Sequence, residues 1–215
     1  MQPRLLSFDV FGTVVDWRRG LLAALGRQGV LAPEAAFDEI IDAQALAESG
    51  VNAGDGEFSS YRQIAARSLE QELGLTPAAA GEIADGIGAW PVFADSPGGL
   101  RQLMAAVPCV ATTNSDYAHR EPVERQLGGP LSAWVCSEEL RLYKPDPRFW
   151  EQTAERLGAP LARDWWHVSA YADYDLETAR RLGLTTVFVG RPHARPGAAD
   201  HRVSDLLELC RLICE

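Results

Sequence analysis

The chain has 215 residues, of which 47% are hydrophobic and 23% charged, as in ordinary globular proteins. This length exceeds that of most single domains, so one core with a sizeable insertion, or two small domains, is expected. The formal net charge of −10 argues against a nucleic-acid partner, because phosphate backbones are bound by clustered lysine and arginine. No apolar run approaches the ~18 residues that would span a bilayer, so no membrane partner is expected.

The first residues and the cysteines bear on the cellular compartment. The N-terminal segment has neither a long apolar stretch nor the small-residue cleavage site of a signal peptide. The four cysteines form no C-x-x-C pair and are predicted to be free thiols. Both observations favour a reducing cytoplasm.

Short apolar or β-branched segments that end abruptly in polar or small residues predict buried parallel strands. The five predicted strands are Arg4–Asp9, Pro108–Thr113, Ala133–Cys136, Trp165–Ser169 and Thr185–Val189. Helical stretches follow at Ala118–Gln126, Pro147–Leu157 and Asp175–Leu182, each with a glycine at or just beyond its end. This alternation predicts an α/β fold with a doubly wound, Rossmann-like, five-stranded core and helices on both faces.

Almost a hundred residues separate the first strand from the second, and most of them look helical. The predicted helices are Arg18–Arg27, Pro33–Glu48, Phe58–Leu73 and Pro77–Trp90, separated by breakers at Gly29, Gly50–Gly56, Gly74 and Pro91. This predicts an all-helical cap domain over residues 16–93, inserted into a core domain of residues 1–15 and 94–215. Residues 190–200 are expected to form a loop before a last helix, Val203–Ile213. The cap also offers a surface for a possible homodimer.

The end of the first strand carries the clearest chemical signal. In a doubly wound sheet, ligands bind beyond the carboxyl ends of the strands. Asp9 stands at such an end and is followed by Val-Phe-Gly-Thr. This sequence provides a glycine for a tight turn and, in Thr13, a hydroxyl able to hold the carboxylate. Asp9 is therefore a candidate functional residue, although a carboxylate here also suits a simple cap.

Three later segments supply further candidates. Thr113 and Asn114 end the second strand in front of a predicted helix N-terminus, a place that favours anions. Lys144 lies in Tyr-Lys-Pro-Asp-Pro, and Asp175 ends the cluster Asp-Tyr-Asp. Plain structural interpretations stay open for each: turn residues for the first two, a solvated lysine, and a helix cap for Asp175.

At these residues the sequence resembles the haloacid dehalogenase superfamily, and the motifs follow in the same order along the whole chain. The resemblance implies that Asp9 is the nucleophile and Thr113 the hydroxyl of the second motif, with Asn114 as its amide neighbour. It also implies that Lys144 stabilises charge around the nucleophile and that Asp175 is the carboxylate of the fourth motif.

Two positions favour the 2-haloacid dehalogenase branch. Phe11 stands where the phosphatase branch has a second aspartate that protonates the leaving alcohol, which is worth roughly 10²- to 10⁴-fold in rate. Halide leaves without a proton. Ala170 stands where Mg²⁺-dependent members have an acidic ligand. We therefore expect no required cofactor and no metal site, and if Mg²⁺ were bound its ligands would be Asp9 and Asp175.

The mechanism expected from this resemblance is cleavage of a carbon–halogen bond in a small anionic substrate, an (S)-2-haloacid or similar carboxylate. Asp9 displaces halide from C2, and water hydrolyses the resulting ester. Lys144, Thr113 and backbone N–H groups near Val10 and Phe11 are expected to orient the carboxylate and stabilise charge. Asn114, Tyr174 and the two residues after Asp9 are predicted to bind substrate.

The sequence also departs from the dehalogenases. The family has an arginine early in the cap that contacts halide or substrate carboxylate. The comparable stretch here, Ile40–Gln44, contains no arginine. Arg18 is the predicted substitute, with Arg19 and Arg62 as further candidates. Two alternatives stay open: a phosphatase of a small phosphorylated metabolite that uses Mg²⁺, and a catalytically weak or inactive homologue that binds a small ligand. The four histidines share no spacing typical of a metal site or triad and are predicted to be structural or exposed.

Overall fold

The computed structural model describes residues 2–33, 35–54 and 57–214. Within them, a six-stranded parallel sheet has the order β3-β2-β1-β4-β5-β6. The strands are β1 (Leu5–Phe8), β2 (Cys109–Thr113), β3 (Ala133–Cys136), β4 (Trp165–Ser169), β5 (Thr185–Val189) and β6 (His201–Val203). Strands β2 and β3 are added on one side of β1, and β4, β5 and β6 on the other side. The topological switch point therefore lies between β1 and β4. The predicted doubly wound architecture is confirmed.

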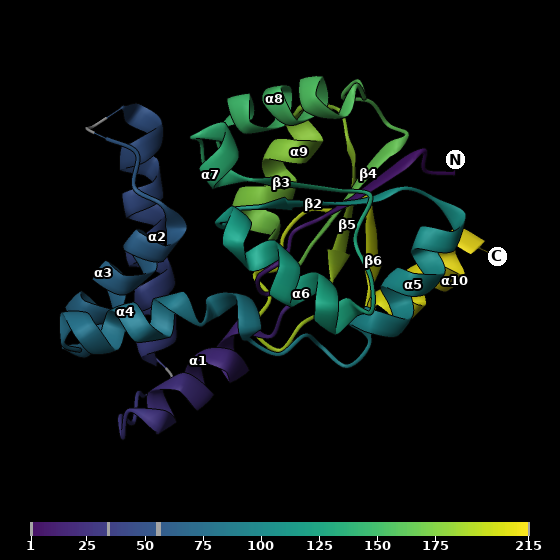
Figure 1. Cartoon of the computed structure of the whole chain (residues 1–215). Coiled ribbons are helices and arrows are strands. Elements are labelled where there is room, and N and C mark those ends of the chain that lie inside the picture. The colour runs from purple at the N-terminus through teal and green to yellow at the C-terminus, as the bar shows by residue number, and fades with distance from the viewer. Residues whose placement is uncertain (1, 34, 55–56, 215) are drawn as a thin grey trace.

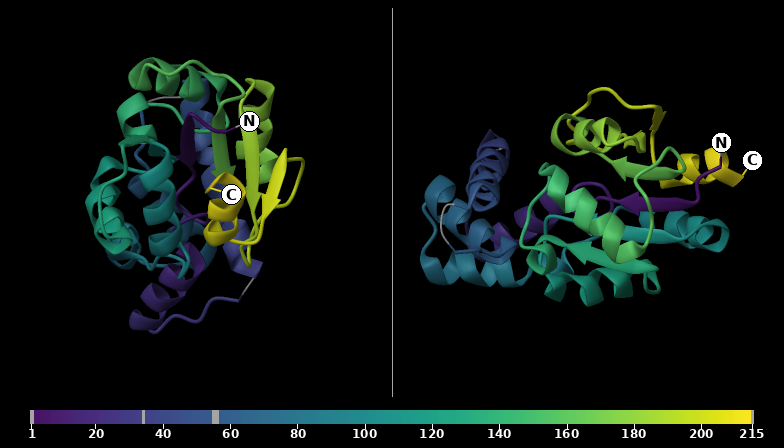
Figure 2. Two further views of the ribbon diagram at one scale, coloured as in Figure 1. Left: turned by 90° about the vertical axis from the view of Figure 1, so that its right-hand side faces the viewer. Right: turned by 90° about the horizontal axis from the view of Figure 1, so that it is seen from above.

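Helices cover both faces of the sheet, as Figure 1 and Figure 2 show. One face packs against α5 (Ser96–Ala106), α6 (Arg120–Leu127) and α10 (Leu206–Cys214), and the other against α8 (Pro147–Leu157) and α9 (Glu177–Arg181). Successive side chains of a strand point to opposite faces, so Leu6 and Phe8 join the first core while Leu5 joins the second. A short helix, α7 (Ser137–Leu140), follows β3.

A second helical group stands beyond the carboxyl ends of the strands (Figure 1). It consists of α1 (Trp17–Arg27), α2 (Ala35–Ala53), α3 (Tyr61–Leu73), α4 (Pro77–Asp85) and the 3-10 turn η1 (Ile87–Ala89), and we call α1–α4 the helical cap. The Ser60 hydroxyl caps α3 by accepting from the backbone N–H of Gln63, and the Gln63 side chain accepts from the backbone N–H of Ser60. No helix in the described part of the chain is long and apolar enough to cross a membrane. The division at residues 15/16 and 93/94 stays a prediction.

The strand count expected from the sequence was wrong by one. Residues 190–200 were predicted to lead directly into a helix at Val203, but β6 pairs with β5 through Val187 and Val189 before α10 begins at Leu206. The segment His-Arg-Val is too short and too polar to show the apolar pattern of the buried strands. An edge strand needs such a pattern on one side at most.

Several helix boundaries also differ from the predictions. Helix α2 continues through Gly50, a predicted breaker, to Ala53, while residues 55–56 of that breaker lie outside the described residues. The helix predicted from Asp175 begins inside a π-helical turn, η3 (Ala172–Leu176), and continues as α9. Helices α5 and α7 were not predicted. Tertiary contacts, rather than local propensity, determine these ends.

Polar contacts join the helical cap to the core. The Asp116 carboxylate, beyond β2, accepts hydrogen bonds from the backbone N–H groups of Tyr61 at 2.8 Å and Arg62 at 2.9 Å. Its negative charge therefore lies at the N-terminus of α3, where the helix dipole favours it. Asn52, near the end of α2, bonds both the backbone N–H and the carbonyl of Tyr143, at 2.8 and 2.9 Å. These bonds explain why α2 extends past Gly50.

Close packing of α1 on the turn that leads back to the core makes one stability prediction. A Cβ added at Gly20 would lie 2.2 Å from Trp90 Cγ and 2.5 Å from its Cβ, whereas one added at Gly26 of the same helix would meet no atom within 4 Å. We expect Gly20→Ala to lower the free energy of unfolding by about 1–3 kcal/mol through overpacking. Gly26→Ala should leave stability unchanged or raise it by about 0.5–1 kcal/mol. Urea unfolding of both variants checks this, and equal effects would contradict the packing.

Candidate active site

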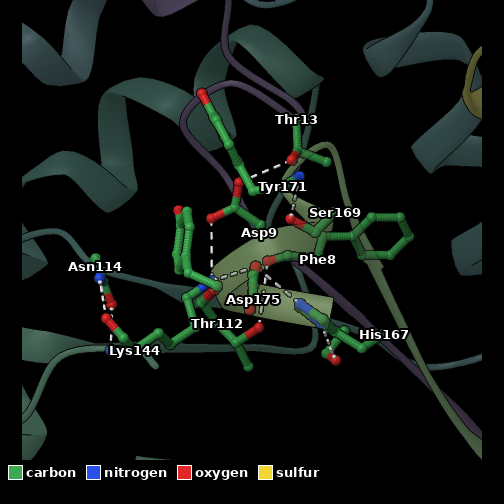
Figure 3. Close-up of polar contacts among 12 residues, drawn as sticks. Phe8, Asp9, Thr13, Thr112, Asn114, Lys144, His167, Ser169, Tyr171 and Asp175 are labelled. Carbon is green, nitrogen blue, oxygen red and sulfur yellow. Dashed lines mark hydrogen bonds and ion pairs between the residues drawn. The ribbon is translucent and has the colours of Figure 1, made fainter. Parts of the chain in front are cut away.

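Asp9 lies directly after β1 and is buried, with 3% of its surface exposed. The Thr13 hydroxyl donates to Asp9 Oδ2 at 2.7 Å and accepts from the backbone N–H of Ala170 at 2.9 Å (Figure 3). The turn between them needs Gly12, whose φ of +97° suits glycine and whose missing Cβ leaves room for the Tyr171 ring. The sequence thus places a carboxylate at the strand end and holds it there by the hydroxyl that was expected to do so.

Lys144 reaches this carboxylate from the segment before α8. Its ammonium group donates to Asp9 Oδ1 at 3.1 Å, to Asp175 Oδ2 at 2.8 Å and to the Thr112 carbonyl at 3.0 Å. The side chain is fully buried, which a lysine tolerates when its charge is paired. Its three hydrogens therefore have three acceptors, and the lysine joins residues from three separate segments.

Two carboxylates share this one ammonium group, and their pKa values separate. Burial raises the pKa of Asp9 above its ordinary value, and the pairing with Lys144 opposes that rise only in part. Burial also acts on Asp175, but the pairing with Lys144 and the contact with His167 outweigh it, so the pKa of Asp175 lies well below its usual range. The two carboxylates in turn keep the pKa of Lys144 raised despite its burial. Asp175 is thus the stable counter-ion, and Asp9 the more basic carboxylate.

His167, predicted to be structural or exposed, contacts the candidate site from inside the sheet. The Trp165 indole N–H donates to Ser7 Oγ at 2.7 Å, so the single Ser7 hydrogen is left for His167 Nδ1 at 2.9 Å. The ring hydrogen then lies on Nε2, which is 3.1 Å from Asp175 Oδ2 (Figure 3). Ser7 and His167 are polar residues within buried strands, and this sequence signal predicts a hydrogen-bonded pair.

A cavity of about 450 Å³ opens between the helical cap and the carboxyl ends of the strands, and Asp9 lines it. Of the residues expected to form the site, those that line it are Asp9, Phe11, Thr113, Asn114, Lys144 and Tyr174. Most of the remaining wall is aliphatic or aromatic and comes from the cap, for example Ile40, Tyr61 and Leu69. Such a cavity, apolar with a few convergent polar groups, is typical of a small-molecule site.

Asn114 has both of its amide hydrogens engaged. Its Nδ2 donates to Glu48 Oε2 of α2 at 3.0 Å and to the Lys144 carbonyl at 2.9 Å. Its Oδ1 accepts from the Lys144 backbone N–H at 2.8 Å and from the Ser137 hydroxyl at 3.2 Å. Asn114 thus fixes the backbone of the lysine segment, while its predicted contact with substrate stays a prediction.

Arg18, the expected substitute for a cap arginine, is directed elsewhere. It pairs with Asp38 at 2.6 Å and lies over the rings of Trp17 and Phe37, 5.4 Å from each centroid. Among the described residues that line the cavity, the cations are Lys144 and an arginine that the sequence did not single out, Arg195.

Arg195 belongs to the segment between β5 and β6. Its backbone bonds Ala170 and Ala172, and its side chain pairs with Asp42 of the cap at 2.9 Å. It also lies 3.7 Å from Asp173. No sequence pattern marks it, because the segment reads as an ordinary loop.

The residues present do not fit a magnesium ion. The carboxylate oxygens Asp9 Oδ1 and Asp175 Oδ2 both accept from the Lys144 ammonium group, which lies between them. Ala170 brings no side-chain oxygen, although Mg²⁺ demands an octahedron of oxygen ligands. In the described residues, no group of three or more His, Cys, Asp or Glu side chains is placed to hold a metal ion.

Comparison with known proteins gives consistent matches. The family model of haloacid dehalogenase-like hydrolases matches residues 3–183. (S)-2-haloacid dehalogenase 4A of Burkholderia cepacia is 23% identical over 225 residues, which cover 99% of this chain and 95% of that protein. The crystal structure of L-2-haloacid dehalogenase PA0810 is 30% identical with a TM-score of 0.84, and the match covers 98% of this chain and 99% of the other. The defluorinating L-2-haloacid dehalogenase Rha0230 is 25% identical with a TM-score of 0.85, over 99% and 96% of the two chains.

Lys144→Met should destabilise the fold in a pH-dependent way. The lowered pKa of Asp175 contributes stability above the carboxyl's unfolded-state pKa of about 3.9, and this contribution is lost as pH falls through the lower folded value. Without Lys144, Asp9 and Asp175 face each other unpaired, their pKa values rise, and we expect a loss of about 3–5 kcal/mol at neutral pH. The deficit should shrink as pH is lowered and the carboxylates take up protons.

Urea unfolding at neutral and acid pH measures this difference. Arg4→Met is the matched control, because it breaks an ion pair with Asp164 whose side chains are 47% and 37% exposed. An exposed pair of this kind contributes at most about 1 kcal/mol. A deficit for Lys144→Met that is small, or that grows on acidification, would contradict the shared-ammonium arrangement.

Proposed function

Because the chain belongs to the haloacid dehalogenase-like hydrolases, we propose that this hydrolase cleaves the carbon–halogen bond of a small 2-haloacid with Asp9 as nucleophile. The observation that carries the proposal is the Asp9 carboxylate at the cavity wall, held by Thr13 and Lys144 at 2.7 and 3.1 Å. Its relatives in sequence and structure are named as haloacid dehalogenases.

The reaction proceeds in two steps. A carboxylate oxygen of Asp9 forms a bond to C2 of the substrate, and the carbon–halogen bond breaks with its electron pair leaving on the halide. Water then adds to the aspartyl carbonyl carbon of the ester. The bond between this carbonyl carbon and the ester oxygen attached to C2 breaks. The 2-hydroxy acid leaves with that oxygen, and one proton is released. The Asp9 carboxylate is regenerated, and no cofactor takes part.

The neighbours of Asp9 suit attack on carbon. Phe11 presents a ring where an acid would be needed to protonate an alkoxide, and it packs against Tyr61 and His119 at centroid distances of 6.3 and 5.7 Å. The ammonium group of Lys144 stabilises the carboxylate before attack and the oxyanion during ester hydrolysis. Because the Asp9 carboxylate and the Lys144 ammonium group are already held in place, little reorganisation is needed as charge develops.

The cavity also bears on the size of the substrate. Its volume of about 450 Å³ lies within the range of sites for drug-sized ligands, and its walls are mostly apolar. We therefore propose that it accepts 2-haloacids with a longer or aromatic side chain as well as 2-chloropropionate. Binding of the larger side chain against the aliphatic and aromatic wall would contribute roughly 25 cal/mol per Å² of apolar surface buried.

Halide release tests the proposal. The protein is incubated in EDTA with chloroacetate, fluoroacetate, 2-chloropropionate, 2-bromohexanoate and 2-chloro-3-phenylpropionate, and halide is measured. We expect halide release that falls by about 10⁴-fold or more in Asp9→Asn, because removal of a nucleophile removes the covalent route. Asp164→Asn, a change at a surface carboxylate, serves as the control. Absence of halide from every acid, together with Mg²⁺-dependent phosphate release from a generic phosphate ester, would refute the proposal.

The raised pKa of Asp9 predicts the acid limb of the pH profile. Asp9 attacks only as the carboxylate, so kcat/KM should fall as pH drops through its pKa, at a higher pH than for an ordinary aspartate. The Thr13 hydrogen bond favours the ionised form, so Thr13→Val should move this limb upward by about one to two pH units. Thr153→Val, a buried threonine of α8, should leave it in place. Superimposable profiles for wild type and Thr13→Val would count against Asp9 as the titrating group.

A further inference from the structure

The cavity contains a buried carboxyl group that the proposed reaction does not use. Glu48 lies on α2 of the helical cap, is 9% exposed, and lines the cavity together with Asp9. Its Oε2 accepts from Asn114 Nδ2 at 3.0 Å. Its Oε1 has no hydrogen-bond partner among the described residues. Because Glu48 lines the cavity, this oxygen is available to a bound ligand.

The charges around Glu48 do not favour a carboxylate. All three hydrogens of the Lys144 ammonium group are engaged by other acceptors, and Asp9 adds a like charge to the same cavity. Burial accordingly raises the pKa of Glu48 to about 8, against the weaker effects of Asn114 and Lys144. At neutral pH the side chain is then a neutral carboxylic acid. Because Oε2 accepts from Asn114, the hydrogen lies on Oε1.

The neighbouring polar side chains are engaged with other partners, so another hydrogen-bond donor is needed for a substrate carboxylate. Both amide hydrogens of Asn114 are spent on Glu48 and on the Lys144 carbonyl. Arg18 is directed to Asp38, and Arg195 to Asp42. An anionic substrate beside ionised Glu48 would be repelled by the like charge. A carboxylic acid in the same place attracts a carboxylate through a charge-assisted hydrogen bond.

We propose that Glu48 is a specificity-determining residue that binds the substrate carboxylate as a neutral acid, with its Oε1–H donating to a carboxylate oxygen. This inference rests on the proposed function, since it assigns the recognition of the acid group of the same substrate. The hydrogen bond sets the substrate between Glu48 of the cap and Asp9 of the core. In this role Glu48 keeps its hydrogen throughout, so it acts on binding rather than on bond breaking.

The proposal makes binding depend on pH in a defined direction. The ionisable groups that face Glu48 are Asp9, Tyr61, Tyr143, Lys144 and Tyr174. Burial raises the pKa of the three tyrosines far above neutrality, so they stay neutral. The raised pKa of Lys144 keeps it charged. Ionisation of Glu48 above pH 8 or so therefore removes the donor, and carboxylate affinity should fall as pH rises.

Propionate, which has the acid group of the substrate but no halogen, is the probe. Its Kd is measured between about pH 6.5 and about pH 9.5 by tryptophan fluorescence, because Trp17 and Trp90 line the cavity. We expect the wild-type Kd to rise by about tenfold per pH unit above the pKa of Glu48. Glu48→Gln keeps an amide donor at every pH, so its Kd should be flat. Glu39→Gln, an exposed change on the same helix, should keep the wild-type profile.

Three results would overturn the inference. The first is a wild-type Kd that does not change over this range, which needs no variant to be observed. The second is an alkaline rise that persists in Glu48→Gln, which would assign the titration to Asp9. The third is a fall in affinity for Arg195→Gln that is equal at all pH values, with Glu48→Gln unaffected, which would assign the carboxylate to Arg195. Propionate binding requires no turnover, so these results are distinct from failure to release halide.

Discussion

The sharing of one buried ammonium group by two carboxylates is the constraint on which the rest of this site depends. Lys144 pairs with Asp9 at 3.1 Å and Asp175 at 2.8 Å, and a single positive charge does not neutralise two negative charges. The additional contact with His167 favours ionised Asp175, and Asp9 is left with the raised pKa. A carboxylate that is ionised but incompletely compensated is a better nucleophile than one held in a saturated ion pair. The asymmetry therefore distinguishes the two acids.

The same constraint reaches into the sheet. Asp175 stands in the π-helical turn η3, which follows β4 and directs the side chain back toward Lys144. A π-helical turn widens the backbone locally, and such turns are frequent at functional sites. A chain of contacts runs from Trp165 through Ser7 and His167 to Asp175, so buried strand residues support Asp175. Removal of the Ser7 hydroxyl would leave the buried Trp165 Nε1 and His167 Nδ1 without this partner, and a buried polar group left unsatisfied costs about 1–3 kcal/mol.

How much of this arrangement the sequence reveals depends on whether the signal is local. Asp9, Thr113, Lys144 and Asp175 were expected at one place because parallel strands bring their carboxyl ends to one edge of the sheet. Three of the five predicted strands, β3, β4 and β5, have their exact bounds in the structure. The sixth strand was missed because His-Arg-Val has neither the length nor the apolar content of a buried strand.

The missed residues depend on contacts between distant segments. Nothing near Arg195 in the sequence indicates that its segment crosses to residues 170–172 and brings the side chain to the cap. Arg18 was the predicted substitute for the missing cap arginine, yet it pairs with Asp38 in the first turn of α2. His167 was overlooked because histidines were compared with one another, whereas its partner is a serine on the neighbouring strand.

The contacts that build the cavity also connect the helical cap to Lys144. Asn52 bonds the backbone of Tyr143, Asn114 bonds the backbone of Lys144, and Glu48 bonds Asn114. Displacement of α2 therefore breaks its bonds to Asn114, which positions Lys144, and to Tyr143, which precedes Lys144. Because Lys144 influences the ionisation of Asp9, the placement of the cap and the charge state of Asp9 are physically coupled. In the proposed reaction, the Asp9 carboxylate is therefore fully organised when the cap lies over the cavity, the position from which water is also best excluded.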